Sequence, residues 1–215
     1  IGHSADNVTD DISFVIRTAA VHDDNPEVHE AHRRGIPVFE RTQAWGALMR
    51  GYQNALCISG THGKTTTTSM CTHIMMAAEK DPTVMIGGTL PLLKACHRVG
   101  KGNTIIMESC EYYNSFLALN PTIAVVLNIE ADHLDFFKDL EDIKHSFRCF
   151  AERVPAETGT VIANYDDANT MDALRGIARK VITFGLNAKA DVYAQNIVHR
   201  GSVSEFDIYH RGNYF

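Results

Sequence analysis

The sequence lacks any uninterrupted apolar stretch near the roughly 18 residues that a membrane-spanning helix needs, so we expect no membrane insertion. It also lacks an excess of positive charge. Its 20 lysines and arginines stand against 26 aspartates and glutamates, a formal net charge of -6 at pH 7. Because proteins that bind nucleic acids usually present a basic face, we expect no nucleic-acid partner. Apolar residues still make up 45% of the 215 residues, enough for a full hydrophobic core.

Paired cysteines and zinc patterns are missing too. The five cysteines are an odd number and include no C-x-x-C pair, which predicts reduced, mostly buried thiols in a cytoplasmic protein. His29 and His32 are too close for the H-E-x-x-H zinc pattern. The chain starts with Ile1, without an initiator methionine or a signal peptide, and it stops close to a strand-like run. We therefore expect a piece of a longer enzyme.

Strand-like apolar runs alternate with helix-like segments along most of the chain. Asn25-Pro26 is typical of a helix start, and Gly35 of a helix end. A glycine-rich and basic connection is expected between residues 86 and 104, and an antiparallel pair of strands from residue 191 onward. The other predicted strands are 12–20, 36–39, 54–59, 83–86, 104–107, 122–127, 160–163 and 180–184, and the predicted helices are 26–34, 42–50, 66–79, 139–151 and 167–178. This order predicts an α/β fold with a mostly parallel sheet, and a boundary between two units near residues 50–54.

A glycine-containing loop follows the strand at 54–59 and opens a helix. Its glycines let successive backbone N–H groups point at phosphate oxygens, and the helix N-terminus adds partial positive charge. Ile58 stands where the strict Walker pattern has its first glycine, so a shorter form of the pattern remains. A glycine turn with an incidental lysine is disfavoured, because strand, loop and helix occur in the required order. The residues expected to bind nucleotide phosphates are Gly60, Thr61, His62, Gly63, Lys64, Thr65 and Thr66.

Polar side chains follow three other predicted strands, where an open parallel sheet places its ligands. Glu108 comes directly after the strand at 104–107, and its carboxylate could reach a Mg²⁺ ion held by Thr65. Asn128 and His133 belong to the stretch Asn-Ile-Glu-Ala-Asp-His that ends the apolar strand at 122–127. A third stretch, 164–167, is polar, but we interpret it as a helix-capping turn.

Together, the segments Ser59–Thr68, Glu108–Phe116 and Asn128–His133 resemble the Mur ligase family of bacterial cell-wall synthesis. The resemblance is strongest to the branch that joins L-alanine to UDP-N-acetylmuramate. It implies a central ATP-binding P-loop domain at 53–215, incomplete at its end, preceded at 1–52 by the last part of a Rossmann-like domain that binds the UDP-sugar. The family's C-terminal domain, which binds the amino acid, is expected to be absent.

The resemblance also implies a reaction and roles for single residues. The substrate carboxylate would attack the γ-phosphate of ATP, and the amine of L-alanine would then displace phosphate from the acyl phosphate. Lys64, Glu108 and His133 would be catalytic, with Thr65, Glu108 and His133 holding Mg²⁺ and Asn128 on the phosphate side. Arg148 stands where several family members carry a carbamoylated lysine, so we expect no carbamate here.

Two alternatives remain open. A related ligase that recycles a murein tripeptide onto the same sugar nucleotide would share the phosphate loop. A catalytically inert nucleotide-binding piece would share it too, and we expect this chain alone to bind ATP weakly without ligating. The sequence indicates no particular oligomeric state.

Overall fold

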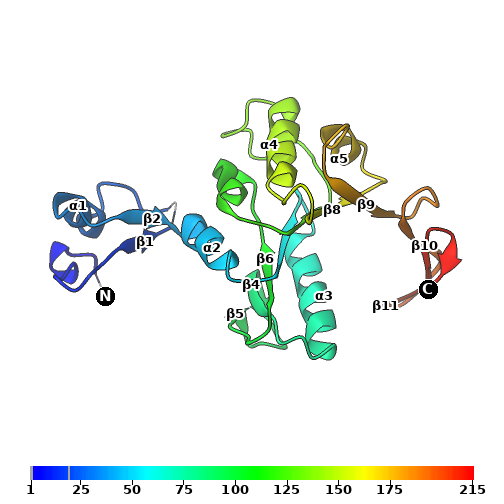
Figure 1. The fold of residues 1–215 in the computed structure, drawn as a ribbon, viewed down its shortest axis with the longest axis horizontal. Coiled ribbons are helices and arrows are strands. Elements are labelled where there is room, and N and C mark those ends of the chain that lie inside the picture. The colour runs from blue at the N-terminus through cyan, green and yellow to red at the C-terminus, as the bar shows by residue number, and fades with distance from the viewer. Residues whose placement is uncertain (1, 19) are drawn as a thin grey trace.

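The computed structural model describes residues 2–18 and 20–215, and ten strands of these residues form one large sheet. Its strand order is β12-β11-β10-β9-β8-β7-β3-β6-β4-β5. A separate two-stranded sheet, β1-β2, lies in the N-terminal part, and α2 connects this part to the rest of the chain (Figure 1). No helix in the described part of the chain is long and apolar enough to cross a membrane.

The strands of both sheets are β1 (Val15–Arg17), β2 (Val38–Glu40), β3 (Asn54–Ser59), β4 (Thr83–Leu90), β5 (Ala95–Arg98), β6 (Thr104–Glu108), β7 (Ile123–Val126), β8 (Thr160–Asn164), β9 (Lys180–Gly185), β10 (Val192–Arg200), β11 (Val203–His210) and β12 (Asn213–Tyr214). The α-helices are α1 (Pro26–Arg33), α2 (Arg41–Met49), α3 (Lys64–Ala77), α4 (Leu140–Glu152) and α5 (Ala168–Ala173). Two 3-10 helices, η1 (Ala5–Asn7) and η2 (Tyr112–Ala118), complete the described elements.

The predicted α/β fold with a mostly parallel sheet is confirmed. Strands β4, β6, β3, β7, β8, β9 and β10 pair in parallel, each with its neighbour in the sheet. The predicted antiparallel pair is confirmed as β10 and β11. Strand β3 lies in the middle, between β6 and β7, although β6 and β7 both follow it in the sequence. The carboxyl ends of these three parallel strands therefore lie at one edge of the sheet.

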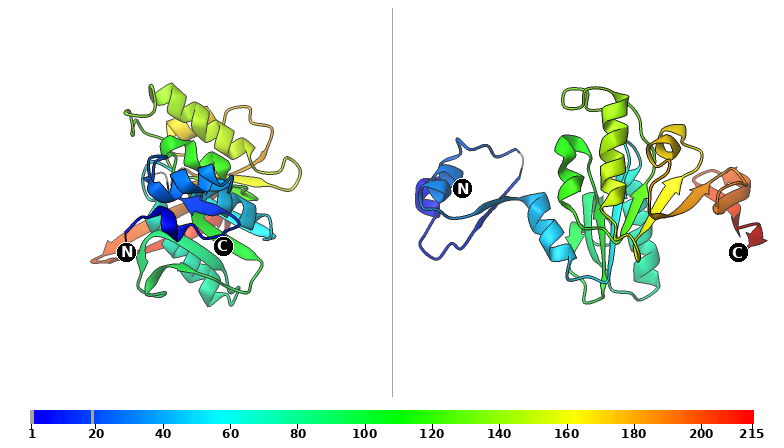
Figure 2. Two further views of the ribbon diagram at one scale, coloured as in Figure 1. Left: turned by 90° about the vertical axis from the view of Figure 1, so that its left-hand side faces the viewer. Right: turned by 45° about the horizontal axis from the view of Figure 1, so that its top comes forward.

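Helices cover both faces of the sheet (Figures 1 and 2). Successive strand residues point to opposite faces, so Cys57 and Ile58 belong to different hydrophobic clusters. Cys57 packs in the cluster that holds Phe147 and Phe150 of α4. Ile58 packs in the cluster that α3 covers with Cys71 and Met75. This burial on both faces explains why the central strands are almost continuously apolar.

Some predicted elements have the wrong length. The predicted strand at 12–20 is only Val15–Arg17, because its partner β2 has three residues; residue 19 lies outside the described residues. Helix α3 begins at Lys64, two residues before the predicted start at Thr66. It follows directly on Gly63, which has the left-handed conformation. Helix α5 ends at Ala173, well short of residue 178, and Gly176 follows it with φ +68°. In contrast, the predicted cap of α1 is confirmed, since the Asn25 side chain accepts from the N–H groups of Glu27 and Val28.

The connection predicted between residues 86 and 104 is also wrong. Strand β4 continues to Leu90, and β5 returns antiparallel to it as the edge strand. Gly87 and Gly88 therefore lie inside a strand instead of after one. Glycine has low strand propensity, so the local sequence does not indicate this edge, which pairing with β4 and the bonds of Arg98 to Pro82 and Asp81 stabilise.

The cysteine prediction is partly confirmed. All five cysteines are free, but Cys96 and Cys110 are exposed, so the thiols are not mostly buried. Burial raises the pKa of the Cys57 thiol to about 12. Desolvation also raises the pKa values of Cys71 and Cys110. The thiolate is the reactive form, so these environments do not mark an activated nucleophile.

Candidate phosphate-binding site

The loop between β3 and α3 has the backbone conformation that its glycines permit. Gly60 has φ +144° and Gly63 has φ +84°. A Cβ atom at Gly60 would lie 2.9 Å from Cβ of Leu127. The loop therefore needs glycine at residue 60 both for its conformation and for its close approach to the end of β7.

The first turn of α3 offers unpaired N–H groups. The N–H groups of Thr61 and His62 donate to Asn128, so they are already used within the protein. Within the described backbone, the N–H groups of residues 63–66 have no such acceptor. These four orphan donors at a helix N-terminus form a site for an anion. Of the predicted phosphate-binding residues, Gly63, Lys64, Thr65 and Thr66 are those whose N–H groups are free to take that role.

Lys64 is folded back over the loop. Its Nζ donates to the carbonyl oxygens of Gly60 at 2.6 Å and Thr61 at 3.2 Å. The same Nζ lies 3.0 Å from Oε2 and 3.2 Å from Oε1 of Glu111. Glu111 follows β6 and is 2% exposed. Glu111 is not among the predicted site residues. It occurs in the same short motif as Glu108, and nothing in the local sequence indicates that its carboxylate is buried.

Glu108 lies at the end of β6, beside the start of α3. The Thr65 hydroxyl donates to Oε1 of Glu108 at 3.0 Å, and the N–H of Gly87 donates to Oε2 at 2.7 Å. The predicted neighbours Thr65 and Glu108 are thus in direct contact. A hydroxyl and a carboxylate are hard oxygen donors of the kind Mg²⁺ prefers.

Asn128 braces the loop from the end of β7. Its Oδ1 accepts from the N–H of His62 at 2.8 Å, and its Nδ2 donates to the carbonyl of His62 at 3.1 Å. The N–H of Glu130 donates to the Thr61 hydroxyl at 2.9 Å. The Asn128 side chain therefore bonds both backbone polar groups of His62 and has a structural contact with the loop.

His133 lies on the other side of Glu111. It has φ +52°, and its ring stacks on Tyr112 with 4.4 Å between the ring centroids. Nε2 of His133 is 3.8 Å from Oε1 of Glu111 and 3.9 Å from Oδ2 of Asp132. The Tyr112 hydroxyl donates to Asp135, and this bond raises the pKa of the phenol and lowers that of the carboxyl.

The predicted metal ligands fall into two contact groups. Thr65 contacts Glu108, whereas His133 approaches Glu111, and no described ion pair joins His133 to Glu108. Within residues 2–18 and 20–215, no group of three or more His, Cys, Asp and Glu side chains is arranged to hold a metal ion. The pair of oxygen ligands at Thr65 and Glu108 fits an ion that takes its other ligands from phosphates and water.

The remaining polar stretch, 164–167, is confirmed as a capping turn. Oδ1 of Asp167 accepts from Thr170 N at 2.7 Å at the start of α5. The same oxygen accepts from Ile129 N at 3.2 Å, so the turn also supports the segment after β7. Arg148, on α4, donates to the carbonyls of Ala173 and Arg175. Its guanidinium therefore has a structural role, joining α4 to the end of α5.

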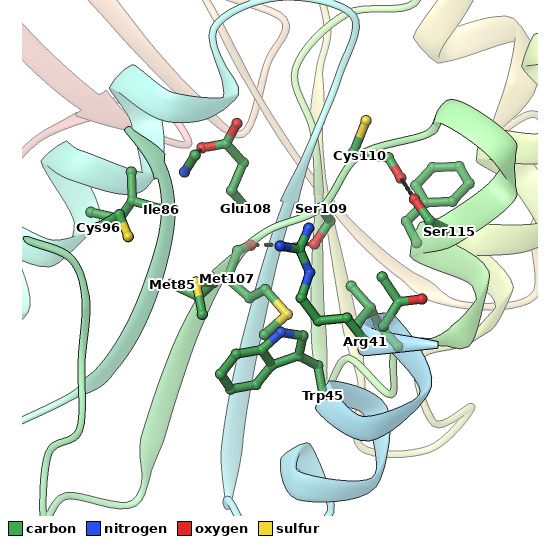
Figure 3. Close-up of a pocket in the computed structure, with 14 residues that line it drawn as sticks. Arg41, Trp45, Met85, Ile86, Cys96, Met107, Glu108, Ser109, Cys110 and Ser115 are labelled. Carbon is green, nitrogen blue, oxygen red and sulfur yellow. Dashed lines mark hydrogen bonds between the residues drawn. The ribbon is translucent and has the colours of Figure 1, made fainter. Parts of the chain in front are cut away.

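A cavity of about 350 Å³ opens beside Glu108, between α2, the middle of β4 and the end of β6 (Figure 3). Arg41 and Trp45 of α2 line it together with Glu108, the last residue of β6, and Ser109, which follows β6. Most of the other lining is apolar, from Met85, Ile86, Met107, Phe116 and Leu119. None of the ion pairs among the described residues includes Arg41.

Comparison with known proteins decides the family. The pattern of the Mur ligase middle domain matches residues 58–214, and that of the Mur ligase family catalytic domain matches residues 1–53. The chain belongs to the Mur ligase family. The resemblance read from the phosphate loop and the two strand-end motifs is thereby confirmed.

Among its Mur ligase relatives, a UDP-N-acetylmuramate–L-alanine ligase of Lachnospira eligens is 46% identical over 194 residues, 90% of this chain and 42% of the relative. The ligase of the same description from Caldanaerobacter subterraneus is 43% identical over 216 residues, 100% of this chain and 46% of the relative. The crystal structure of the UDP-N-acetylmuramate–alanine ligase of Thermotoga maritima superposes with a TM-score of 0.81 at 26% identity, covering 100% of this chain and 48% of that one. The chain thus spans less than half the length of these Mur ligases.

Proposed function

We propose that this chain is the ATP-binding part of a ligase that joins L-alanine to the carboxylate of UDP-N-acetylmuramate in peptidoglycan precursor synthesis. The observation that carries the proposal is the free first turn of α3, with Lys64, Thr65 and Glu108 around it. Relatives described as L-alanine-adding ligases, at 42–46% identity, support the substrate assignment. Residues 1–52 would belong to the domain that binds the UDP-sugar, and residues 53–215 to the ATP-binding domain. The cytoplasm, where the five free cysteines would stay reduced, is the proposed location.

The residues of the site would act mainly by position and charge. The N–H groups of residues 63–66 would bind phosphate oxygens, and Lys64 would place its ammonium on the β- and γ-phosphates. Thr65 and Glu108 would hold Mg²⁺, which supplies charge neutralisation at the phosphates when it is bound. His133 would act as a further ligand of this ion after a movement from Glu111 toward Glu108 when the nucleotide binds. Such fixed charges stabilise a transition state at which negative charge accumulates.

The cavity beside Glu108 is the proposed place of the substrate carboxylate. It adjoins the phosphate site through Glu108, and Arg41 supplies the positive charge that would hold an anion. Its apolar lining would exclude water, which protects an acyl phosphate from hydrolysis. The amine of L-alanine would then attack the acyl carbon and release phosphate.

The competing function is the ligation of a murein tripeptide to the same sugar nucleotide. The crystal structure of the Neisseria meningitidis ligase for UDP-N-acetylmuramate and L-alanyl-γ-D-glutamyl-meso-diaminopimelate superposes with a TM-score of 0.82, covering 99% of this chain and 69% of that one. At 23% identity this likeness shows the fold alone. Product analysis on the complete enzyme, with L-alanine in one reaction and the tripeptide in another, separates the two functions.

Nucleotide binding by the 215-residue chain tests the central claim. We expect isothermal titration calorimetry to detect MgATP binding, and the Lys64→Ala variant to lose it while its circular dichroism spectrum is unchanged. Lys80 is an exposed lysine just beyond the other end of α3, so Lys80→Ala is the matched control and should bind as the wild type does. Equal MgATP affinity of the Lys64→Ala and wild-type chains would rule out the role of the loop.

A further inference from the structure

The buried carboxylate of Glu111 has no role in the proposed site so far, although it lies beside two residues of that site, Lys64 and His133. Glu111 is 2% exposed, and acidic side chains are seldom so buried unless a charged partner compensates them. The only described hydrogen bonds to its carboxylate come from the Lys64 ammonium, and Nε2 of His133 lies 3.8 Å from Oε1. Glu111 thus links the phosphate loop to the segment that follows β7.

The ammonium of Lys64 has no free donor in this arrangement. An ammonium carries three N–H groups. Here they are shared among the carbonyl of Gly60, the carbonyl of Thr61 and the carboxylate of Glu111. A phosphate can reach Nζ only if one of these acceptors leaves. The two carbonyls belong to the loop itself, whereas Glu111 is a negative charge that an arriving polyphosphate would repel.

We propose that Glu111 is a positioning residue that holds Lys64 over the empty loop and transfers it to the nucleotide phosphates on binding. This inference rests on the proposed nucleotide site. When the nucleotide binds, Lys64 keeps its hydrogen bonds to the loop carbonyls and exchanges the Glu111 carboxylate for a phosphate oxygen. His133, already beside Glu111, is the nearest group that can approach the carboxylate when Lys64 leaves.

Two substitutions separate the charge of Glu111 from its size. Glu111→Gln keeps the shape and removes the charge that competes for Lys64. We expect it to bind MgATP roughly tenfold more tightly than the wild type, the effect of one charge-assisted hydrogen bond. Glu111→Asp keeps the charge and should stay near the wild-type affinity. The control is Glu130→Gln, which removes an equal charge from an exposed carboxylate beside His62 and should change the affinity less than about twofold.

The contact itself can be observed without nucleotide. In ¹⁵N-lysine NMR spectra of the 215-residue chain, a hydrogen-bonded ammonium exchanges slowly enough to give a signal. We expect a Lys64 ammonium signal in the wild type and in Glu111→Asp. The signal should weaken in Glu111→Gln, where the loop carbonyls and a neutral amide oxygen replace the charged acceptor. Lys64→Arg, which removes this signal, assigns it.

The outcomes are distinct. A weakened signal together with tighter MgATP binding in Glu111→Gln supports the transfer. A Lys64 signal of wild-type strength in Glu111→Gln, or unchanged affinity while the wild type binds MgATP, overturns the role of Glu111 and leaves the proposed function intact. No MgATP binding by the wild-type chain would refute the proposed function, and this inference with it.

Discussion

Gly87→Ala should displace the carboxylate of Glu108 without unfolding the protein. A Cβ atom at Gly87 would lie 2.7 Å and 2.8 Å from the two carboxylate oxygens of Glu108 and 2.9 Å from its Cδ. These atoms are the far end of a flexible side chain, so Glu108 can rotate away. Its contacts with the Thr65 hydroxyl at 3.0 Å and the Gly87 N–H at 2.7 Å would then be lost.

The expected effect on binding is larger than the effect on stability. A hydrogen bond to a charged group contributes about 1.5–3 kcal/mol, so misplacing Glu108 should weaken MgATP binding by roughly tenfold to a hundredfold. Both Gly87 and the carboxylate it contacts are near solvent, and we expect the melting temperature to fall by no more than about 5 °C. Binding of ATP in EDTA should change little, because without Mg²⁺ Glu108 has no ion to hold.

The neighbouring glycine provides the control. A Cβ atom at Gly88 would meet only Cγ2 of Thr65, at an ordinary contact distance of 3.6 Å. Titration calorimetry of both variants with ATP, in Mg²⁺ and in EDTA, measures the difference. If Gly87→Ala and Gly88→Ala bind MgATP equally well, Glu108 does not hold the ion and the proposed metal site is wrong.

Two further predictions concern the fold. Gly46→Ala places a Cβ atom against the carbonyl oxygen of Ala118, where neither backbone can yield. About 3 kcal/mol of overpacking against about 1 kcal/mol of gained helix propensity should lower the melting temperature by roughly 4–8 °C. Gly51→Ala has its nearest contact at 3.4 Å and should melt within about 2 °C of the wild type; equal melting of the two variants would contradict the packing of α2 on η2. For the thiols, Ellman's reagent at pH 8 should modify exposed Cys96 in the native chain, whereas buried Cys57, with its pKa raised to about 12, should react only after unfolding. Mass spectrometry of the labelled peptides measures this, and native labelling of Cys57 would show that β3 is not buried.

Local sequence patterns predicted the elements that depend on neighbouring residues. The strand, the glycine loop and the helix at 54–77 were found because glycine conformation, apolar runs and helix starts act over a few residues. Edge strand β5 was missed, since its exposed residues have no pattern of burial. Glu111 was missed for a related reason. Its burial comes from Lys64 and His133, which lie 47 and 22 residues away in the sequence.

Short stretches of the chain suffice to predict the phosphate loop, the alternation of strands and helices, and the likeness to Mur ligases. The groups that surround Lys64 follow from the folded sheet alone. Strand order, set by pairing between distant segments, places β6 and β7 on either side of β3. That order brings Glu108 to Thr65, Glu111 to Lys64 and Asn128 to His62. Register and burial depend on contacts across the whole sheet, and no short stretch of sequence contains these contacts.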